Sequence, residues 1–249
     1  MSMSMTEEEK FHNQEIEKLI RKQMEDAGAK GYVIGLSGGV DSALCATLCC
    51  RAVGSDKVSG IFMPSRVTPS EDKSDVKDLC INLGMGWQEI LIDPIIDTYR
   101  HIPDFVETPY LLGNLMARTR MALLYYCANR DNLLVCGTSN QTEYLLSYCT
   151  KYGDNAADIQ PIIHLLKDEV YKLAAILCIP EQIRMRTPSA GLYEGQTDEK
   201  ELGLTYPEID IAIRRLKENN FVAQSDTERL VLAKIQAGAH KRNPSPSFM

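Results

Sequence analysis

The sequence lacks the features of several protein classes. No apolar run in its 249 residues approaches the roughly 20 residues that a membrane-spanning helix needs. The segment from Met1 to Lys10 is polar and acidic, unlike a secretory signal peptide. A basic excess is also absent, because 27 Lys and Arg face 34 Asp and Glu, for a formal net charge of −7. We therefore expect a cytoplasmic protein that binds neither membranes nor nucleic acid.

The cysteines lack the spacing of a metal site or a redox motif. The chain has eight cysteines, and no two of them form a CxxC pair. Its four histidines show no ligand spacing beside them, which argues against zinc. Most of the cysteines lie in apolar stretches, where a free thiol behaves as a small hydrophobic group. We expect buried, reduced thiols, as in a cytosolic protein.

Short apolar runs alternate with segments of helical periodicity. Runs typical of buried parallel strands occur at 32–36, 58–63, 89–92 and 132–137. Helical patterns occupy 6–27, 40–53, 69–83, 110–130, 167–178, 207–219 and 225–239. The alternation predicts a single α/β domain over 1–249, with a Rossmann-like parallel sheet flanked by helices.

Two segments depart from this simple alternation. The helix over 110–130 is apolar nearly all the way round, so we expect it to be buried on several sides or to lie in an oligomer interface. The segment 186–199 is rich in Gly, Pro, Ser and Thr and has no periodicity. Long loops in compact domains are often lids, so we expect a mobile active-site loop there.

The segment Ser37-Gly38-Gly39-Val40-Asp41-Ser42 lies between a predicted strand and a predicted helix, which is the context of a phosphate-binding turn. Its glycines permit close approach of the backbone to a ligand. Backbone amides and the helix N-terminus present positive charge to an anion, and the serine hydroxyls add donors. Neither GxxxxGK[ST] nor GxGxxG is present, so this is not one of the two commoner phosphate loops.

Asp41 stands inside this turn, at the start of the predicted helix. A carboxylate beside phosphates repels them unless a cation lies between. Asp41 is therefore predicted to bind Mg²⁺, which prefers carboxylate and phosphate oxygens. The alternative is an aspartate that only stabilises the helix N-terminus, and the position after a buried strand favours the metal.

Asn114 and Arg118 lie four residues apart on one face of the predicted helix over 110–130. Because unpaired charge is costly to bury, the arginines of this apolar helix need partners. The carboxylate or phosphate of a ligand would accept an arginine fork well. Structural ion pairs are an equal alternative.

The motifs together resemble the N-type ATP pyrophosphatases, which cleave ATP between its α and β phosphates, and among them the ammonia-dependent NAD synthetases. SGGxDS is similar to the pyrophosphate loop of that superfamily. Further segments are similar to NxxARxRM, GTxNxxE, TKYGDGGxD, PSAGLxxGQTDE and HKR of the synthetases, in the same order between about Glu9 and Arg242. Asn155-Ala156 stands where the family usually has two glycines.

The resemblance implies an adenine nucleotide alpha-hydrolase-like fold and the last step of NAD biosynthesis. Deamido-NAD is amidated by ammonia to give NAD, AMP and pyrophosphate, with ATP as co-substrate and an acyl-adenylate as intermediate. The implied ATP-binding residues are Gly35, Leu36, Ser37, Gly38, Gly39, Val40, Asp41, Ser42, Thr138, Lys167 and Ser189. Those implied for deamido-NAD are Asn114, Arg118, Lys151, Asp158, His240 and Lys241. Mg²⁺ would be held by Asp41 and Glu143, and the implied catalytic residues are Asp154, as partner of ammonia, and Lys167.

The resemblance also implies a homodimer with deamido-NAD bound near the subunit interface. Glutamine-using relatives carry an additional amidohydrolase domain, for which 249 residues leave no room, so we expect free ammonia as the nitrogen donor. The competing interpretations are a GMP synthetase, a tRNA thiolase and a non-catalytic adenine-nucleotide-binding module. The missing CxxC disfavours the thiolase, and the joint presence of Asp41, Glu143 and Lys167 favours catalysis over the module.

Overall fold

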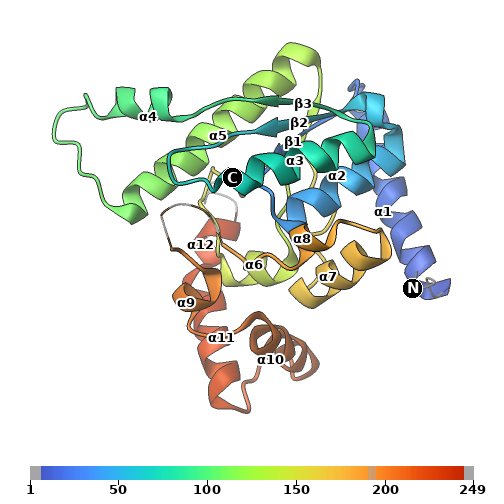
Figure 1. Cartoon of the computed structure of the whole chain (residues 1–249). Helices are drawn as coiled ribbons and strands as arrows, with labels where there is room; N and C mark the ends of the chain where they lie inside the picture. Colours follow the sequence, from blue (N-terminus) through green and yellow to red (C-terminus); the bar gives the residue numbers. More distant parts are fainter. Residues whose placement is uncertain (1–6, 190, 192, 194, 244–249) are drawn as a thin grey trace, which may run out of the picture.

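A four-stranded parallel sheet forms the centre of the computed structural model, which describes residues 7–189, 191, 193 and 195–243 (Figure 1). The strand order is β3-β2-β1-β4, with β1 at Tyr32–Leu36, β2 at Val58–Phe62, β3 at Gly86–Glu89 and β4 at Leu134–Cys136. The chain leaves β1 toward β2 on one side and reaches β4 on the other, so the order reverses at β1. In open α/β sheets such a switch point is where ligands bind, beyond the carboxyl ends of the strands.

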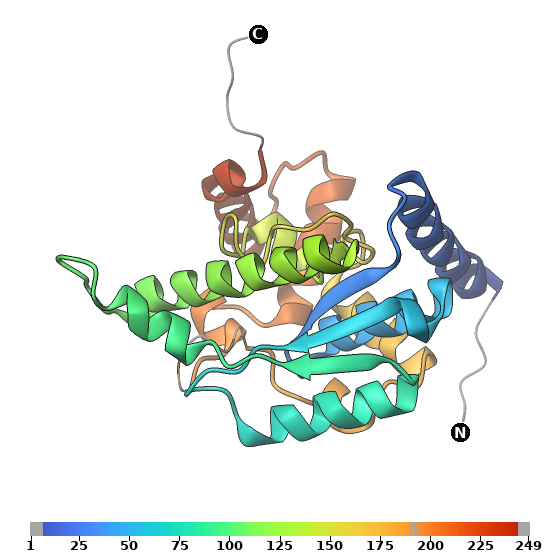
Figure 2. The same ribbon diagram turned by 90° about the horizontal axis from the view of Figure 1, so that it is seen from above.

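Helices cover both faces of the sheet, as Figure 2 shows from above. One face packs against α1 (Glu7–Asp26), α2 (Val40–Val53), α3 (Ser70–Leu83) and α7 (Lys167–Ile176). The other face packs against α4 (Asp93–Tyr99) and α5 (Pro109–Asp131). Within β1, Tyr32, Ile34 and Leu36 join the first core and Val33 joins the second, which is the period of two that a strand buried on both faces requires. The predicted α/β sheet flanked by helices is confirmed.

A third core lies among the C-terminal helices, beside the carboxyl edge of the sheet (Figure 1). It is built mainly by α6 (Gln141–Leu146), α10 (Tyr206–Glu218) and α11 (Asp226–Ala237). The first turn of α10 is fixed by a capping box, in which Thr205 Oγ1 accepts from the Glu208 amide and Glu208 accepts from the Thr205 amide. Short helices complete this part of the chain: α8 (Glu181–Arg184), α9 (Asp198–Leu202) and α12 (Ala239–Arg242).

The predicted third strand was displaced from the real one. We expected it at 89–92, but β3 pairs with β2 from Ser59↔Gly86 to Phe62↔Glu89. The apolar residues that suggested the strand lie just beyond it, where Ile90 N donates to Phe62 O at 2.9 Å and Ile92 N donates to Pro64 O at 3.1 Å. The polar segment Gly86–Glu89 forms the strand because its neighbour β2 offers a free edge, so tertiary pairing overrides local propensity.

The other predicted elements differ from the structure mainly at their ends. The short helices α4, α6, α8 and α12 and the 3-10 turn η1 (Ser55–Lys57) were not predicted. The predicted loop 186–199 ends in the first turn of α9, which begins at Asp198. Ala190, Leu192 and Glu194, which belong to that loop, lie outside the described residues.

The cysteines are free thiols, as predicted, whereas the apolar helix α5 keeps some of its large side chains exposed. All eight cysteines are free, and five of them are buried. Helix α5 lies on the sheet, yet Tyr110 is 74% exposed and Tyr126 is 63% exposed, so it is not buried on every apolar side. Within the part of the chain that the structure describes, no helix has both the length and the apolar character needed to cross a bilayer.

Candidate active site

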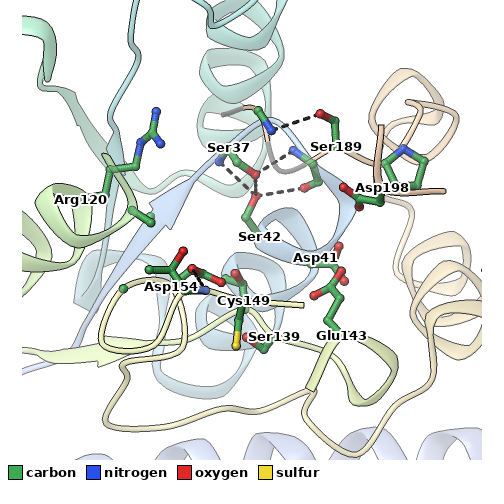
Figure 3. Close-up of a pocket in the computed structure, with 18 of the residues that line it drawn as sticks. Ser37, Asp41, Ser42, Arg120, Ser139, Glu143, Cys149, Asp154, Ser189 and Asp198 are labelled. Atoms are coloured by element: carbon green, nitrogen blue, oxygen red, sulfur yellow. Dashed lines mark hydrogen bonds between the residues drawn. The ribbon is translucent and has the colours of Figure 1, made fainter. Parts of the chain in front are cut away.

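A cavity of about 1250 Å³ lies at the carboxyl ends of β1, β2 and β4 (Figure 3). It is the switch point that the strand order predicts. Most of the residues expected to bind ATP line it: Gly35, Leu36, Ser37, Gly39, Val40, Asp41, Ser42, Thr138, Lys167 and Ser189. The sequence motifs therefore converge on one hollow, although they are spread over most of the chain.

The turn from Ser37 to Ser42 is held open as a cradle by its own side chains. Ser42 Oγ accepts from the Ser37 amide at 3.3 Å and donates to Gly39 O at 3.0 Å, while the Gly39 amide donates to Ser37 Oγ at 3.2 Å. No side chain caps the N-terminus of α2, so its first amides are available to an anion. Gly38 adopts a φ of +81°, which only glycine takes without strain.

Two carboxylates and one ammonium group stand at the inner end of the cradle. Lys167 Nζ lies 2.6 Å from Asp41 Oδ2 and 2.9 Å from Glu143 Oε1. The lysine side chain is 3% exposed, whereas Asp41 and Glu143 are 18% and 19% exposed toward the cavity. Tyr206 closes the site from the other side, with its ring centroid 4.9 Å from Nζ. We predicted all three charged residues for this site but not their direct pairing.

The charges in this group depend on one another. Burial lowers the pKa of Lys167, but Asp41 and Glu143 outweigh burial and raise the pKa above its ordinary value. Burial also raises the pKa of the Glu143 carboxyl, to about 7, against the opposing effect of Lys167. A protonated Lys167 is thus the cation that keeps two carboxylates compatible with a poorly hydrated site.

Two polar residues that we did not predict hold this group in place. Asn140 is fully buried, caps α6 by accepting from the Glu143 amide at 3.0 Å, and donates to Asp41 Oδ1 at 2.9 Å. Thr142, also fully buried, accepts from the Lys167 amide at 3.0 Å and donates to Asp210 at 2.5 Å. Both residues lie in the segment resembling GTxNxxE, but the sequence does not show that they orient Asp41 and Lys167.

Asp154 stands at the opposite side of the cavity from Glu143 and Asp198 in Figure 3. Its Oδ1 accepts from the Thr150 amide at 2.8 Å, which fixes the carboxylate. The side chain is open to the cavity, and the surrounding walls remove enough water to raise the pKa of Asp154 above that of an ordinary aspartate. A carboxylate held in this way can accept a proton from a molecule in the cavity.

Of the two arginines Arg118 and Arg120 of α5, Arg120 faces the cavity, whereas Arg118 is exposed and donates to Lys151 O at 3.3 Å. Arg120 Nε donates to Met63 O at 3.0 Å, and burial lowers the pKa of its guanidinium to about 10. Asn114 does line the cavity, where its Oδ1 accepts from Thr150 Oγ1 at 2.9 Å. The helical spacing of Ala117, Met121 and Leu124, which also line it, could have indicated the face that carries Arg120.

The remaining residues expected to hold deamido-NAD lie around a second, smaller cavity of about 470 Å³. Lys151 and Lys241 line it, and Lys241 and Ala156 line the main cavity as well, so the two hollows adjoin. Asp158 lines neither cavity, but its Oδ1 accepts at 3.4 Å from Oη of Tyr125, which lines the smaller one, while Oδ2 accepts from the Val135 amide at 2.7 Å. His240 lines neither cavity, but its carbonyl accepts from Lys151 Nζ at 2.8 Å.

The segment after Arg186 closes one wall of the main cavity. Asp198, 5% exposed, accepts from Tyr206 Oη at 2.9 Å and from Tyr148 Oη at 3.1 Å. Figure 3 shows Asp198 beside Asp41 and Glu143, which makes this end of the cavity strongly acidic. We did not single out Asp198, because an aspartate near the start of a short helix has no distinctive spacing.

The donor set at this end fits Mg²⁺. Asp41 and Glu143 converge on one ammonium nitrogen, so their oxygens already face a common point. Among the described residues, no group of three or more His, Cys, Asp and Glu is arranged to hold a metal alone. Mg²⁺ usually takes only one or two carboxylates and completes its shell with water and phosphate oxygens, so two carboxylates beside a phosphate cradle suffice.

The comparisons with known proteins agree on one family. The family model described as NAD synthase matches residues 12–245. The NH(3)-dependent NAD(+) synthetase of Methanoregula boonei is 53% identical over 235 residues, which cover 94% of this chain and 95% of the relative. Among solved structures, the NMN synthetase from Francisella tularensis superposes with a TM-score of 0.87 at 33% identity, covering 96% and 97% of the two chains. The NH3-dependent NAD synthetase from Campylobacter jejuni has a TM-score of 0.82 at 30% identity, covering 96% and 99%.

Proposed function

We propose below how the site of this chain works, given that the chain belongs to the NAD synthase family and is an NH3-dependent NAD synthetase. Such an enzyme is a ligase that catalyses the final step of NAD biosynthesis. The main cavity binds ATP with its β and γ phosphates in the Ser37–Ser42 cradle, and the nicotinate carboxylate of deamido-NAD meets the α-phosphate. The observation that carries the proposal is the ammonium of Lys167, held between Asp41 and Glu143 beside that cradle.

The first step is adenylation. An oxygen of the nicotinate carboxylate forms a bond to the α-phosphorus, and the bond from that phosphorus to the bridging oxygen of pyrophosphate breaks. Negative charge develops on the leaving pyrophosphate, where the uncapped amides of α2 donate hydrogen bonds. The Ser37 and Ser42 hydroxyls add theirs when they turn away from their contacts within the cradle. Lys167 lies close enough to turn toward the α-phosphate and stabilise its charge.

Asp41 and Glu143 would hold Mg²⁺ in the nucleotide complex. When bound, the ion neutralises phosphate charge and polarises the phosphoryl oxygens. The protein's own part is to aim both carboxylates at one point, and Asn140 orients Asp41 through its 2.9 Å hydrogen bond. Lys167 does the same for both through its ion pairs, so the site is organised before the ion arrives.

The second step is attack by ammonia on the acyl carbon of the adenylate. The new carbon–nitrogen bond forms as the bond from carbon to the AMP oxygen breaks, AMP leaves with the electron pair of that bond, and the nitrogen releases one proton to solvent to become the amide. Ammonium must lose a proton before it can attack, and Asp154 is the carboxylate placed in the cavity to take that proton. Its raised pKa makes it a better proton acceptor than an ordinary aspartate.

The dinucleotide substrate spans the two adjoining cavities. The nicotinate end lies in the main cavity near Asn114 and Arg120, and the remainder passes Lys241 toward the smaller cavity with Lys151. These lysines supply positive charge for the diphosphate of deamido-NAD. Arg118 and His240 border this path from outside the cavities and take their expected role only if the substrate extends that far.

A homodimer is the expected assembly, with the smaller cavity near its interface. The apolar side chains that α5 leaves exposed support this, since Tyr110 is 74% exposed, Tyr126 is 63% exposed and Leu111 is 46% exposed. Sedimentation at micromolar concentration should give twice the monomer mass, and a stable monomer would exclude the assembly.

Competing substrates give the direct test of the proposed function. The purified protein is incubated with ATP, MgCl₂ and ammonium chloride, and with deamido-NAD, nicotinate mononucleotide or xanthosine monophosphate. We expect NAD, AMP and pyrophosphate from deamido-NAD, in equal amounts, and no GMP from xanthosine monophosphate. Preferred turnover of nicotinate mononucleotide would assign the chain the substrate of an NMN synthetase, and nucleotide binding without pyrophosphate release would make it a binding module.

A further inference from the structure

Arg186 joins the segment above the cavity to the phosphate cradle and to helix α3. Its Nη2 donates to Asp75 Oδ2 at 2.9 Å, and its Nη1 forms an ion pair with Asp72. The same Nη1 donates to the carbonyl of Gly38, inside the cradle, at 3.4 Å. Arg186 also lines the main cavity, together with Asp72, Ser37 and Gly39. None of these contacts has a role in the proposed adenylation and amidation steps.

The two aspartates fix the guanidinium without using all of its hydrogen-bonding capacity. Arginine has five N–H groups in a planar fork. The contacts of Arg186 engage three of them, and the 3.4 Å contact to Gly38 O is long for a hydrogen bond. Asp72 Oδ1 is buried and forms an ion pair with Nη1. Arg186 thus keeps N–H groups that a ligand of the cavity can engage.

The position of Gly38 ties this arginine to the cradle itself. A Cβ atom at Gly38 would lie 2.6 Å from Arg186 Nη1 and 3.3 Å from Asp72 Cβ. The guanidinium thus packs directly on the backbone that is expected to carry the phosphates, at a place where any larger residue would push it away. The side chain is 23% exposed, so it is shielded from bulk water but open to the cavity.

Arg186 supplies the positive charge at this end of the cradle, where it is paired with the carboxylates of Asp72 and Asp75. Burial raises the pKa of Asp72, and the Arg186 guanidinium opposes this rise. Asp72 and Asp75 hold Arg186 in position, as carboxylates do for arginines that must bind another anion. The inner end of the cavity already has its cation in Lys167, whereas the outer end of the cradle has Arg186 alone among the described lining residues near Gly38.

We propose that Arg186 is a pyrophosphate-binding catalytic residue, positioned by Asp72 and Asp75, that donates to the terminal phosphates of ATP and to the leaving pyrophosphate. The inference rests on the proposed function, since it requires ATP phosphates in the Ser37–Ser42 cradle. When the bond from the α-phosphorus to the bridging oxygen breaks, its electron pair stays on pyrophosphate, and Arg186 stabilises that charge from the side opposite Lys167.

A purely structural role for Arg186 makes a different prediction. An arginine that only fastens the 186–199 segment to α3 would affect every ligand of the cavity alike, because Thr187, Ser189 and Gln196 of that segment line the cavity. An arginine that touches the terminal phosphates affects ATP and pyrophosphate but leaves AMP unchanged. Comparing these three ligands therefore separates the two roles.

The experiment is isothermal titration calorimetry with ATP, inorganic pyrophosphate and AMP, each with MgCl₂, on the full-length protein. Arg186→Gln should weaken ATP and pyrophosphate roughly 10- to 100-fold and leave AMP within about twofold, as expected for loss of a charged hydrogen bond. Arg186→Lys, which keeps the charge without the fork, should lose less. Arg184→Gln is the matched control, because Arg184 is also partly buried but donates to Ile179 O at 2.9 Å and does not line the cavity.

The outcomes are distinguishable. Equal affinities of wild type and Arg186→Gln for pyrophosphate, or equal losses for AMP and ATP, would overturn the assignment of Arg186 while leaving the proposed function standing. Wild-type protein that binds neither ATP nor pyrophosphate would overturn the proposed function itself. Should Arg186→Gln fail to fold by circular dichroism, Arg186→Lys and Asp75→Asn carry the test, with a smaller loss expected for ATP and pyrophosphate and none for AMP.

Discussion

Lys167 places its ammonium nitrogen 2.6 Å from Asp41 Oδ2, although 126 positions separate the two residues in the chain. The pair joins the first turn of α2 to the first residue of α7, and Glu143 of α6 completes it. A cation thus occupies the point on which both carboxylates converge. For Mg²⁺ to bind there, the ammonium must move aside, and the nearest anions that could receive it are the phosphates of a bound nucleotide.

Replacing Asp41 by Asn should abolish turnover without unfolding the protein. The amide is nearly the same size and keeps one oxygen, but it removes the charge that faces the metal and the Lys167 ammonium. We expect NAD formation to fall at least about 100-fold, the range seen when a key electrostatic group is lost. Asp78→Asn, at an exposed position of α3, is the matched control and should keep full activity. Near-normal activity of the Asp41 variant would remove Asp41 from the metal site.

Replacing Lys167 by Met should destabilise the protein and make it more responsive to magnesium. Removing one partner of a buried charge group leaves the others uncompensated, so we expect a loss of about 3 kcal/mol in the free energy of unfolding. Millimolar MgCl₂ should recover part of this loss, because the freed carboxylates can take the ion in place of the ammonium. Urea titrations with and without MgCl₂ measure both effects.

The control for that variant is on the same helix. Lys172 is 69% exposed and pairs with Asp168 at 3.1 Å, so Lys172→Met should change the free energy of unfolding by about 1 kcal/mol or less, with no magnesium response. A Lys167 variant as stable as this control, or equally stable with and without magnesium, would show that the ammonium does not compete with the metal.

Motifs in the sequence can identify the residues of this site, but they cannot show which side chains from distant parts of the chain contact one another. Asp41, Glu143 and Lys167 were assigned from their motifs, and the cavity brings them together. Their direct ion pairs could not be foreseen, because the spacing along three separate helices says nothing about which side chain reaches which. The pairing of Arg186 with Asp72 and Asp75 escaped for the same reason.

Local signals predicted most of the sheet but not its edge. The runs at β1 and β2 are apolar because both faces of these strands are buried, so they stand out in the sequence. The edge strand β3 at Gly86–Glu89 is polar and only partly buried, and it pairs because β2 offers an open edge. Similarly, the sequence did not single out Arg120, because the sheet beneath α5 decides which face of this helix meets the cavity.

The pH dependence of the amidation step should follow Asp154. The pKa of this carboxyl is raised by burial, so it becomes ionised, and able to accept a proton from ammonium, only above the ordinary aspartate range. We therefore expect the rate of adenylate aminolysis in single-turnover experiments to fall as pH decreases through this raised pKa. Asp154→Asn should be slower at every pH and lose the acidic limb, while pyrophosphate release keeps its rate. An acidic limb that persists in Asp154→Asn would assign the proton transfer elsewhere.

Adding a methyl group to the cradle should show how closely it is packed. Gly38→Ala must place a side chain at a φ of +81°, where non-glycine residues lose roughly 1–2 kcal/mol, and its Cβ would lie 2.6 Å from Arg186 Nη1. Gly28→Ala is the control, because Gly28 has a φ of +59° but nothing within 4 Å of the added Cβ. We expect both variants to lose stability in urea titrations, but only Gly38→Ala to weaken ATP binding. Equal ATP affinity of the two variants would mean that the cradle tolerates the contact.

The hydroxyl of Tyr206 should stabilise the cavity wall around Asp198 more than it affects the Lys167 ammonium, which the ring covers. Tyr206 Oη donates to Asp198 at 2.9 Å, and its ring covers the Lys167 ammonium at 4.9 Å. Tyr206→Phe keeps the ring and the contact with Lys167 but removes a donor from an aspartate that is 5% exposed. We expect a loss of about 1–3 kcal/mol in the free energy of unfolding, because a buried acceptor loses a partner.

The effect of Tyr206→Phe should also be local. Hydrogen exchange should become faster in α9, which Asp198 begins, while the amides of β1 stay protected as in wild type. Ile211→Val, on α10 where the side chain is 49% exposed, should leave both stability and exchange unchanged. If exchange in α9 is the same in all three proteins, the second donor to Asp198, Tyr148 Oη at 3.1 Å, is sufficient to hold this wall, and Tyr206 contributes mainly through its ring.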